Sequence, residues 1–319
     1  MDLIYTDANR IDQGVLKAYA LDLSFGAKEN DFEVTLDAEH TLESRAFVYI
    51  EGTEYGGIVD GLKTSTDSKT ITFMGKTWHG VINSKVIKPN NGEDYLVVSG
   101  DANEILDFLI DRLGLGDLFT ASEELSGIVI SNYKFNRYCF GYDGIKAMLT
   151  SKDAKLKIAW ENRSVRLSAE PIVDYTKDPI DDNRATLSVE RYDRKVNHLI
   201  CLGKGDLAER EVIHLFVDQF GRIGDVQYYT GLDEVEDVYE NTNAEGEELR
   251  SGGIKRLKEL RNNDKAEISV SENVEQFYDI GDIVGASEIK SGVSVTSTVS
   301  QKIVRINNGV ISTEYQTGE

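Results

Sequence analysis

Apolar and polar residues alternate with a period of two through much of the first hundred residues, the pattern of strands that bury one face. The clearest example is residues 32–36, where three apolar positions alternate with a glutamate and a threonine. Similar runs, separated by Gly, Asp and Ser turn residues, are found at 16–25, 47–50, 55–66 and 69–74. Short strands at this spacing predict a barrel or a sandwich.

The period changes after Gly100. Asp101 followed by Glu104 has the form of a capping box with Asp101 as the N-cap, and Gly114 is a natural stop. The apolar residues between them share one helical face: Ile105, Leu106, Leu109, Ile110 and Leu113. A second short helix is predicted around 142–149, and then a hairpin in which 156–160 and 165–169 flank a polar loop at 161–164.

The second half of the chain begins with a polar connector between Pro171 and Pro179 that continues through residues 181–183. Strand patterns resume at 185–190, 196–202 and 211–217. Residues 231–250 carry eight acids and one base, and one helix face is then marked by Leu249, Gly253, Leu257 and Leu260. Gly252 and Gly253 are each expected to weaken that helix by about 1 kcal/mol relative to alanine.

The last fifty residues return to strands and turns, at 266–270, 278–285, 292–298 and 299–306. Asn308-Gly309 is a strong hairpin signal for the final pair. We find no short tandem repeat.

Composition sets the scale of the molecule. With 319 residues, 40% of them hydrophobic, the chain can bury a core and is expected to form two to four compact units. No run approaches eighteen apolar residues, and the first residues have neither a basic region nor an apolar core, so we expect no transmembrane helix and no secretory signal.

Charge excludes some partners. The chain has 56 acidic and 35 basic residues, a formal net charge of −21. Binding to duplex DNA needs a basic stripe, and none is visible, which argues against specific nucleic-acid binding; the same deficit argues against docking on anionic lipid. Two cysteines, Cys139 and Cys201, cannot form a disulfide framework and fit reduced thiols in a protein made in the cytoplasm.

The segment 203–208 matches G-x-G-x-x-A, and Asp225 follows at the distance of a ribose-binding acid. A dinucleotide site needs this motif to open a helix, but residues 211–217 have the pattern of a strand. We therefore favour a glycine-rich hairpin turn.

Metal and nucleophile signals are equally weak. His198, Cys201 and His214 do not follow a known zinc spacing, and on a strand positions 198 and 201 point to opposite faces, so ordinary strand residues are favoured. Cys139, between two aromatic residues, is expected to be a buried small hydrophobe. The acidic segment 233–240 is expected to be a solvated face, because the spacing of a calcium-binding EF-hand is absent. The sequon at Asn162 carries little weight without a signal peptide.

Taken in order, several segments resemble one family. They are residues 30–34, the hairpin 156–169, the pair 196–203 and 212–218, the turn 278–285, and 302–309 with Tyr315. This order is similar to that of the phage tail hub family, which includes siphophage tail-associated proteins, myophage baseplate hubs and prophage tail proteins. The resemblance spans nearly the whole chain.

The resemblance implies a homotrimer at the distal end of a tail, whose paired barrel-like domains make a pseudo-sixfold ring. Its implied partners are the tail tube or distal tail protein, the tape-measure protein, and a tail spike or fibre. It implies a virion location, no shared catalytic residues and no cofactor or metal. We add the hypothesis that acidic side chains line the central channel, so that DNA passes without adhering.

These inferences combine into one expectation: an α+β fold, mainly β, with tail-hub architecture. Its parts are a barrel-like β domain at 1–96, a small α+β domain at 97–172, a β-rich domain with the acidic segment and the helix at 173–264, and a barrel-like β domain at 265–319. A contribution of the third part to the second barrel stays open. Two alternatives stay open as well: a tail-associated cell-wall hydrolase or peptidase, and a carbohydrate-binding adhesin suggested by fifteen tyrosines and two tryptophans. Trp160 alternates with Leu156 and Ile158, which favours a core position.

Overall fold

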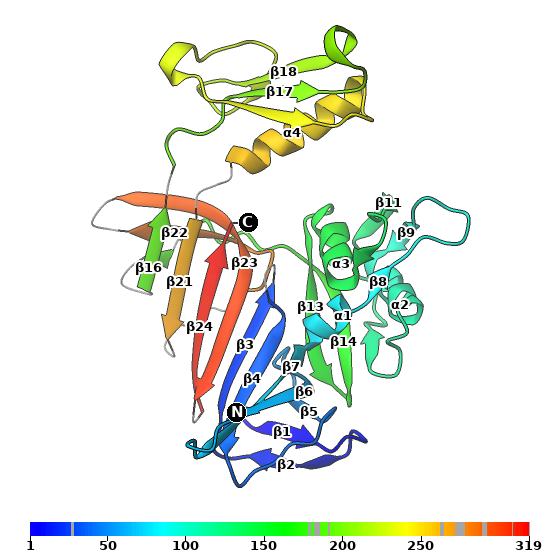
Figure 1. Cartoon of the computed structure of the whole chain (residues 1–319), viewed down its shortest axis with the longest axis vertical. Coiled ribbons are helices and arrows are strands. Elements are labelled where there is room, and N and C mark those ends of the chain that lie inside the picture. Colours follow the sequence, from blue (N-terminus) through cyan, green and yellow to red (C-terminus); the bar gives the residue numbers. More distant parts are fainter. Residues whose placement is uncertain are drawn as a thin grey trace.

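The computed structural model describes residues 1–26, 29–177, 180–181, 186–190, 192–261, 265–271, 278–288, 292–307 and 309–318. The described chain is mainly β, with one large sheet, four smaller sheets and few helices (Figure 1). The parts of the predicted turns that fall on Pro179, Asp182, Asn183 and Asn308 lie outside the described residues.

The N-terminal strands form an antiparallel sheet in the spatial order β3-β4-β7-β6-β5-β1-β2. Their bounds are β1 Leu3–Thr6, β2 Asp12–Leu16, β3 Ala20–Gly26, β4 Asp31–Asp37, β5 Phe47–Tyr49, β6 Gly56–Thr64 and β7 Thr70–Thr77. The predicted strands from residue 32 to residue 74 are confirmed, and the alternation in β4 buries Phe32, Val34 and Leu36. Within the run 16–25, the predicted alternation from Ala20 to Phe25 is confirmed as β3, whereas Leu16 belongs to a separate strand, β2, which it ends.

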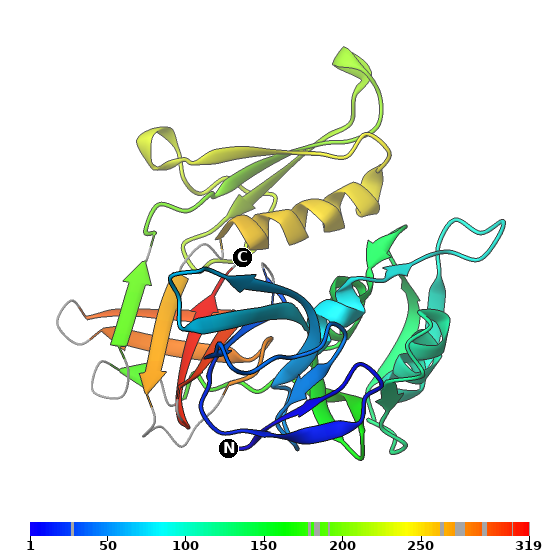
Figure 2. The same ribbon diagram turned by 60° about the horizontal axis from the view of Figure 1, so that its bottom comes forward.

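The C-terminal strands continue the same sheet. Their bounds are β15 Ile180–Asp181, β16 Thr186–Glu190, β21 Lys265–Ser271, β22 Ile283–Glu288, β23 Val293–Asn307 and β24 Val310–Thr317. The segments predicted at 292–298 and 299–306 form one strand, β23, whose first half pairs with β22. Its second half pairs with β24 along one edge and with β3 along the other, which joins both ends of the chain in a single 13-stranded sheet (Figure 2).

A small α+β unit lies beside the N-terminal strands. Its elements are α1 Trp78–Asn83, β8 Val86–Ile87, β9 Val97–Asp101, α2 Ala102–Arg112, β10 Phe119–Ala121, β11 Val129–Lys134, β12 Cys139–Phe140, α3 Gly141–Thr150, β13 Ala154–Glu161 and β14 Ser164–Pro171. Both predicted helices and the predicted hairpin are confirmed as α2, α3 and β13–β14. Asp101 is the N-cap of α2, where its carboxylate accepts from the Asn103 N–H at 2.9 Å, and Gly114 takes a left-handed φ of 67° just past the helix end.

The core of this unit includes residues from β5 and α1. Trp160 is 4% exposed, and its ring stacks on Tyr49 at 4.1 Å and on Trp78 at 5.3 Å between centroids. The prediction that Trp160 packs in a core is therefore confirmed. Because both tryptophans are buried, neither can stack on a sugar, which removes part of the basis for the adhesin alternative.

Residues 196–261 form a unit that we call the outer unit, at the top of Figure 1. Its elements are β17 His198–Leu202, the 3₁₀ turn η1 Leu207–Glu209, β18 Val212–Val217, β19 Ile223–Gly224, the turn η2 Gly231–Asp233, β20 Glu236–Glu240 and α4 Gly246–Arg261. The strands lie in the order β19-β18-β17-β20, and the predicted helix is confirmed as α4, with Leu249, Gly253 and Leu257 buried against one face of the sheet. No helix in the described part of the chain is long and apolar enough to cross a bilayer.

Candidate functional site

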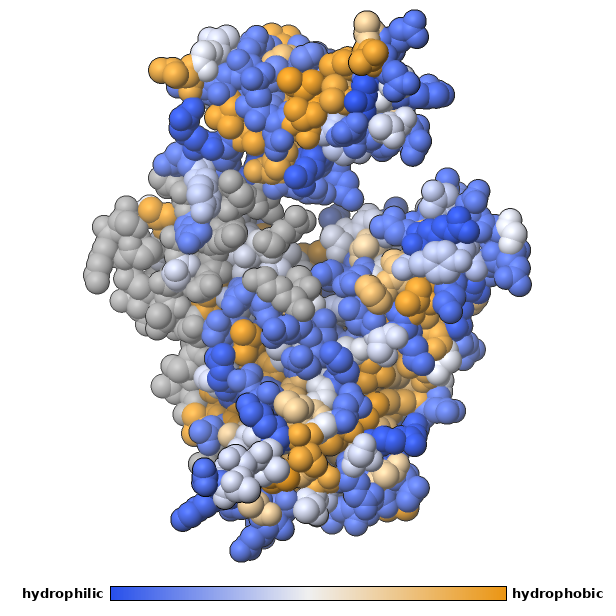
Figure 3. Space-filling model, viewed as in Figure 1, coloured by the Kyte–Doolittle hydropathy of each residue, from blue (hydrophilic) through white to orange (hydrophobic). Residues whose placement is uncertain are grey.

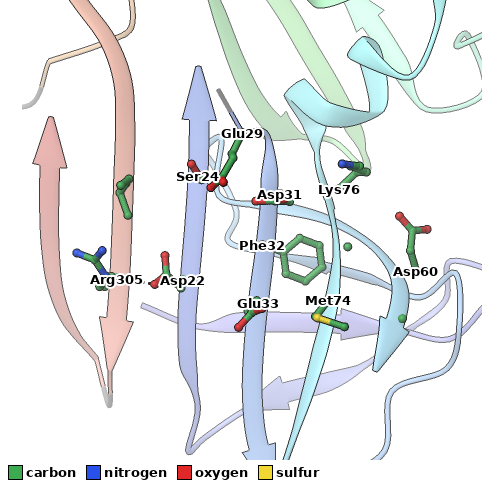
Figure 4. Close-up of a pocket in the computed structure, with 13 residues that line it drawn as sticks. Asp22, Ser24, Glu29, Asp31, Phe32, Glu33, Asp60, Met74, Lys76 and Arg305 are labelled. Carbon is green, nitrogen blue, oxygen red and sulfur yellow. Dashed lines mark hydrogen bonds and ion pairs between the residues drawn. The ribbon is translucent and has the colours of Figure 1, made fainter. Parts of the chain in front are cut away.

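The outward face of the large sheet carries a groove of about 640 Å³ across β23, β3, β4, β7 and β6, which we call the acidic groove (Figure 4). It is lined by Asp22, Ser24, Glu29, Asp31, Phe32, Glu33, Asp60, Gly61, Met74, Gly75, Lys76, Ile303 and Arg305. The strand register explains the row at its centre, because Arg305 lies opposite Asp22, which lies opposite Glu33, which lies opposite Met74. Figure 4 shows the acidic side chains distributed around Phe32 and Met74.

Five carboxylates and two basic groups, Lys76 and Arg305, line the acidic groove, so its negative charge is only partly compensated. Asp22 faces Arg305, whose Nε lies 3.2 Å from its Oδ2, although Arg305 also pairs with Glu314 at 3.1 Å. Glu29, Asp31, Glu33 and Asp60 have no ion-pair partner among the described residues. A concave surface with this balance repels polyanions and attracts cations.

A second charged feature is buried where three parts of the chain meet. It consists of Glu54, His79, Lys155, Lys157, Asp279, Asp282 and Lys302, which we call the ionic junction. Lys302 on β23 lies with its Nζ 2.5 Å from Glu54 and 3.7 Å from Asp279. Three carboxylates meet three lysines here, so the formal charges cancel.

Lys155 on β13 completes the ionic junction from the small unit. Its Nζ donates to Asp282 at 2.7 Å and to Asp279 at 3.1 Å, while Lys157 donates to Asp279 at 2.9 Å. Asp282 is fully buried and also accepts from the Val173 N–H at 2.9 Å. The ionic junction therefore ties the N-terminal strands, the small unit and the C-terminal strands together through charge-assisted hydrogen bonds.

The pKa values of the junction follow from burial and pairing. Burial alone would raise the pKa of Asp279, but Lys302 and Lys157 outweigh it and lower that pKa to about 2. Burial likewise opposes the charge of Lys302, yet Glu54 and Asp279 hold its pKa above the usual value. For His79, burial dominates and lowers the pKa to about 4, so this imidazole is neutral at pH 7.

The comparisons with known proteins now bear on this architecture. No family model matches the chain, and no curated protein matches its sequence. Solved structures do match. The chain is similar to a tail protein from Neisseria meningitidis MC58 (TM-score 0.59, 10% identity, covering 100% of this chain and 96% of the other) and to the prophage MuSo2 43 kDa tail protein from Shewanella oneidensis (0.61, 11%, 99% and 98%). It is also similar to a chain of the p2 virion baseplate in its activated conformation (0.51, 11%, 99% and 98%).

This chain has the fold of phage tail proteins. At these identities the likeness establishes the fold alone, and it extends over the whole chain rather than one unit. The expected fold class, α+β and mainly β, and the resemblance to phage tail and baseplate proteins are thereby confirmed.

Within the tail-protein fold, the G-x-G-x-x-A segment occupies the connection between β17 and β18, which pair antiparallel. Gly203 packs under Leu249 and Ala244, and Gly205 has a φ of 103°. The prediction of a glycine-containing hairpin connection is confirmed, and the motif does not open the helix that a dinucleotide would need.

The structure separates the three suspected metal ligands. Cys201 is buried toward α4, while His198 and His214 meet on the opposite face of the sheet, 2.8 Å apart between ring nitrogens. Cys139 is half-buried rather than buried, so that prediction was too strong; burial raises the pKa of its thiol. Asn162 lies in the β13–β14 turn with a φ of 51°.

Sequence reasoning missed the ionic junction, although one signal was available. Lys302 shares its strand parity with Val304 and Ile306, both of which are buried. A lysine in the inward register of an amphipathic strand predicts a buried carboxylate partner, because an unpaired buried charge is too costly. The identity of the partners could not be read locally, since Glu54 lies 248 residues away in the chain.

Proposed function

We propose that this protein is a structural component of a phage or prophage-derived tail tip or baseplate. In this role it forms a trimeric hub that joins the tail tube or distal tail protein to a spike or fibre. The observation that carries the proposal is the match of nearly its whole length to tail proteins and to a p2 baseplate chain. We assign it no catalytic activity.

The free edges of the large sheet support assembly into a ring. Among the described residues, β16 and β2 end the main path of strands and β15 ends the branch through β22, so in our proposal the outer backbone groups of β2 pair with another chain. On and beside β2, Ile11 is 56% exposed and Val15 is 43% exposed. Closed rings remove such edges, which is why we assign β2 to the contact between protomers.

The acidic groove supports a role in DNA passage. Four carboxylates without ion-pair partners would keep a lumen negative, so that DNA could slide without adhering to the wall. In our proposal the acidic groove faces the central channel of the trimer.

The outer unit supports contact with the spike or fibre. Four of its large apolar side chains are more exposed than is usual: Leu207 at 96%, Leu232 at 91%, Val226 at 82% and Phe220 at 71%. Apolar patches are visible on this unit in Figure 3. Leu207 precedes β18, whereas Phe220, Val226 and Leu232 all lie in the connections between β18 and β20. In our proposal the spike or fibre covers these last three side chains, because a contiguous apolar patch is typical of a surface that a partner covers.

Light scattering coupled to size-exclusion chromatography tests the assembly. We expect a species of three times the 35.6 kDa protomer mass, either alone or after co-expression with the adjacent tail genes of its source genome. Val15→Lys should reduce the trimer fraction, whereas Leu62→Lys, a matched change at an exposed apolar residue on β6, should not. A monomer under every condition would contradict the proposal, as would an electron-microscopy map of the trimer with the acidic groove facing outward.

A further inference from the structure

The face of the outer sheet that points away from α4 brings together two histidines and two glutamates. His198 begins β17 and lies opposite Glu236 in the parallel β17–β20 pair, while His214 on β18 lies opposite Ile200, two residues along β17. Glu234 follows η2, two residues before Glu236. Strand alternation therefore places the side chains of His198, His214 and Glu236 on one face.

The ligand atoms are already close. His198 Nδ1 lies 2.7 Å from Glu234 Oε1 and 3.1 Å from Glu236 Oε1, and these three atoms all lie within 4.8 Å of one another. On the other side of the ring, His198 Nε2 lies 2.8 Å from His214 Nδ1. The imidazole also stacks on Phe216 with 4.3 Å between centroids, so its orientation is fixed.

The cluster has two carboxylates and no compensating Arg or Lys in the described part of the chain. The side chain of His198 is 8% exposed and that of Glu234 is 19% exposed, and neither glutamate has an Arg or Lys partner among the described residues. The amide of Gln227 donates to Glu234 Oε1 at 2.7 Å but brings no charge. Two carboxylates converging on one imidazole nitrogen are stable only if that nitrogen carries a proton or binds a metal.

The donor set selects the class of metal. One imidazole and two carboxylates suit zinc and its first-row neighbours, whereas magnesium and calcium prefer oxygen donors alone. Zinc ligands lie about 2.0–2.2 Å from the metal, so the three atoms need only separate slightly to admit it. Glu236 is 56% exposed, which leaves the cluster open to solvent for entry of the ion and for a water ligand.

We propose that His198, Glu234 and Glu236 bind a divalent transition-metal ion, with zinc the best fit, and that His214 is a positioning residue. Nδ1 of His198 binds the metal, and its Nε2–H donates to His214 Nδ1, the kind of hydrogen bond that orients metal-ligating histidines. The ion links Glu236, at the start of β20, to His198 on β17, and so holds the acidic segment 233–240 against the sheet. This site reverses our expectation from sequence that the chain holds no metal, and it is independent of the hub role proposed above.

Titration calorimetry of the full chain with ZnCl₂ in metal-free buffer at pH 7.5 tests the site, with MgCl₂ as the comparison. We expect one zinc per chain, and a thermal unfolding midpoint that rises with zinc but not with magnesium. Glu234→Gln and Glu236→Gln should each weaken zinc binding at least tenfold, and His214→Ala about tenfold, the usual effect of losing such a partner.

Glu209→Gln is the matched control, an exposed glutamate of the same unit outside the cluster, and it should bind zinc like the wild type. Glu236 is exposed, so its substitution should leave the fold intact and remain interpretable even if variants at His198 do not fold. Absence of zinc binding at millimolar concentration would overturn the proposal. So would equal affinities in the wild type, Glu234→Gln and Glu236→Gln, which would indicate adsorption to the acidic surface.

Discussion

Replacing Lys302 with methionine tests whether the ionic junction holds the units of the chain together. The lysine side chain is 4% exposed, and its ammonium group contacts Glu54 and Asp279. Methionine retains most of the buried hydrocarbon, so the change removes the charge with little loss of packing. Two carboxylates would then lose a shared cation.

The substitution would leave Asp279 with more of its ion pairs than Glu54. Asp279 keeps Lys155 and Lys157, at 3.1 and 2.9 Å. Among the described residues Glu54 keeps one other partner, His79 at 3.5 Å, which is neutral at pH 7 because burial lowers its pKa to about 4. Removing one partner of a buried ion pair costs about 3–5 kcal/mol, and we expect the free energy of unfolding to fall by this amount, mainly through Glu54.

Equilibrium unfolding in guanidinium chloride, followed by tryptophan fluorescence, measures the loss. Trp78 and Trp160 are both buried in the core beside the ionic junction, so their emission reports the parts that the junction ties together. Circular dichroism under the same conditions shows whether the outer unit unfolds separately, which matters because a chain of several units need not unfold in one step.

Two further variants make the result interpretable. Lys63→Met, at an exposed position on β6, should change stability by less than about 0.5 kcal/mol. The double change Lys302→Met with Glu54→Leu removes both charges and should recover much of the loss, because an apolar pair replaces a buried ion pair at little cost. A Lys302→Met protein within about 1 kcal/mol of the wild type would refute the reasoning, since it would mean that Glu54 is solvated or paired elsewhere.

Three other expectations concern acid stability, helix packing and capping. The pKa of His79 is about 4 in the folded state against 6.5 in the unfolded state, so its contribution of about 3 kcal/mol to stability is present above pH 6.5 and is lost as the pH falls toward 4. The pKa of Asp279 is about 2 against 3.8, so a further contribution of about 2 kcal/mol is lost as the pH falls from about 4 toward 2. Unfolding free energies measured at stepped pH should show both ranges. An unfolding free energy that is flat between pH 6.5 and 4 would contradict the first. Gly253→Ala should destabilise the outer unit by about 1–3 kcal/mol despite alanine's helix propensity, because its Cβ would overlap Cys201 Sγ and approach Leu215 Cδ1 closely. Adding Cys201→Ala should relieve the first of these overlaps and recover part of the loss, and hydrogen exchange in β17 measures both effects. Asp101→Ala should cost about 1–2 kcal/mol in thermal unfolding, because the Asp101 carboxylate also accepts from the Ser126 and Gly127 N–H groups at 3.0 and 2.9 Å; an unchanged midpoint would show that water replaces it.

Local features of the fold could be read from the sequence because each depends on neighbouring residues. The N-cap at Asp101, the stop at Gly114 and the alternation of β4 are set within a few positions. The sequence also predicted that Gly253 weakens α4, but it did not show why a glycine is needed there. The structure gives the reason, since a glycine lets the helix approach Cys201 and Leu215 closely.

Long-range features could not be read in the same way. β1 and β2 were missed because Asp12–Leu16 has only its last residue buried and so lacks an alternating pattern. The pairing of β3 with β23 joins residues between 275 positions (Gly26 and Gln301) and 287 positions (Ala20 and Asn307) apart, a separation that no local pattern in either strand encodes. The sequence identified His198 and His214 of the candidate metal cluster as possible ligands. It could not identify Glu234 and Glu236, because they lie in an acidic stretch in which no single glutamate differs from its neighbours.

Net charge illustrates why composition alone could not locate function in this chain. The carboxylates of the ionic junction and of the acidic groove contribute equally to the formal charge of −21. In the ionic junction they are buried or largely buried and matched by lysines, so they act on stability, and salt screens them little. In the acidic groove all but Asp22 lack an ion-pair partner among the described residues, so these carboxylates act on charged molecules that approach the surface, over a distance that salt controls. The same residue type therefore stabilises the fold in one place and repels polyanions in the other, and the difference is whether the tertiary fold brings a lysine within ion-pair distance of a largely buried carboxylate.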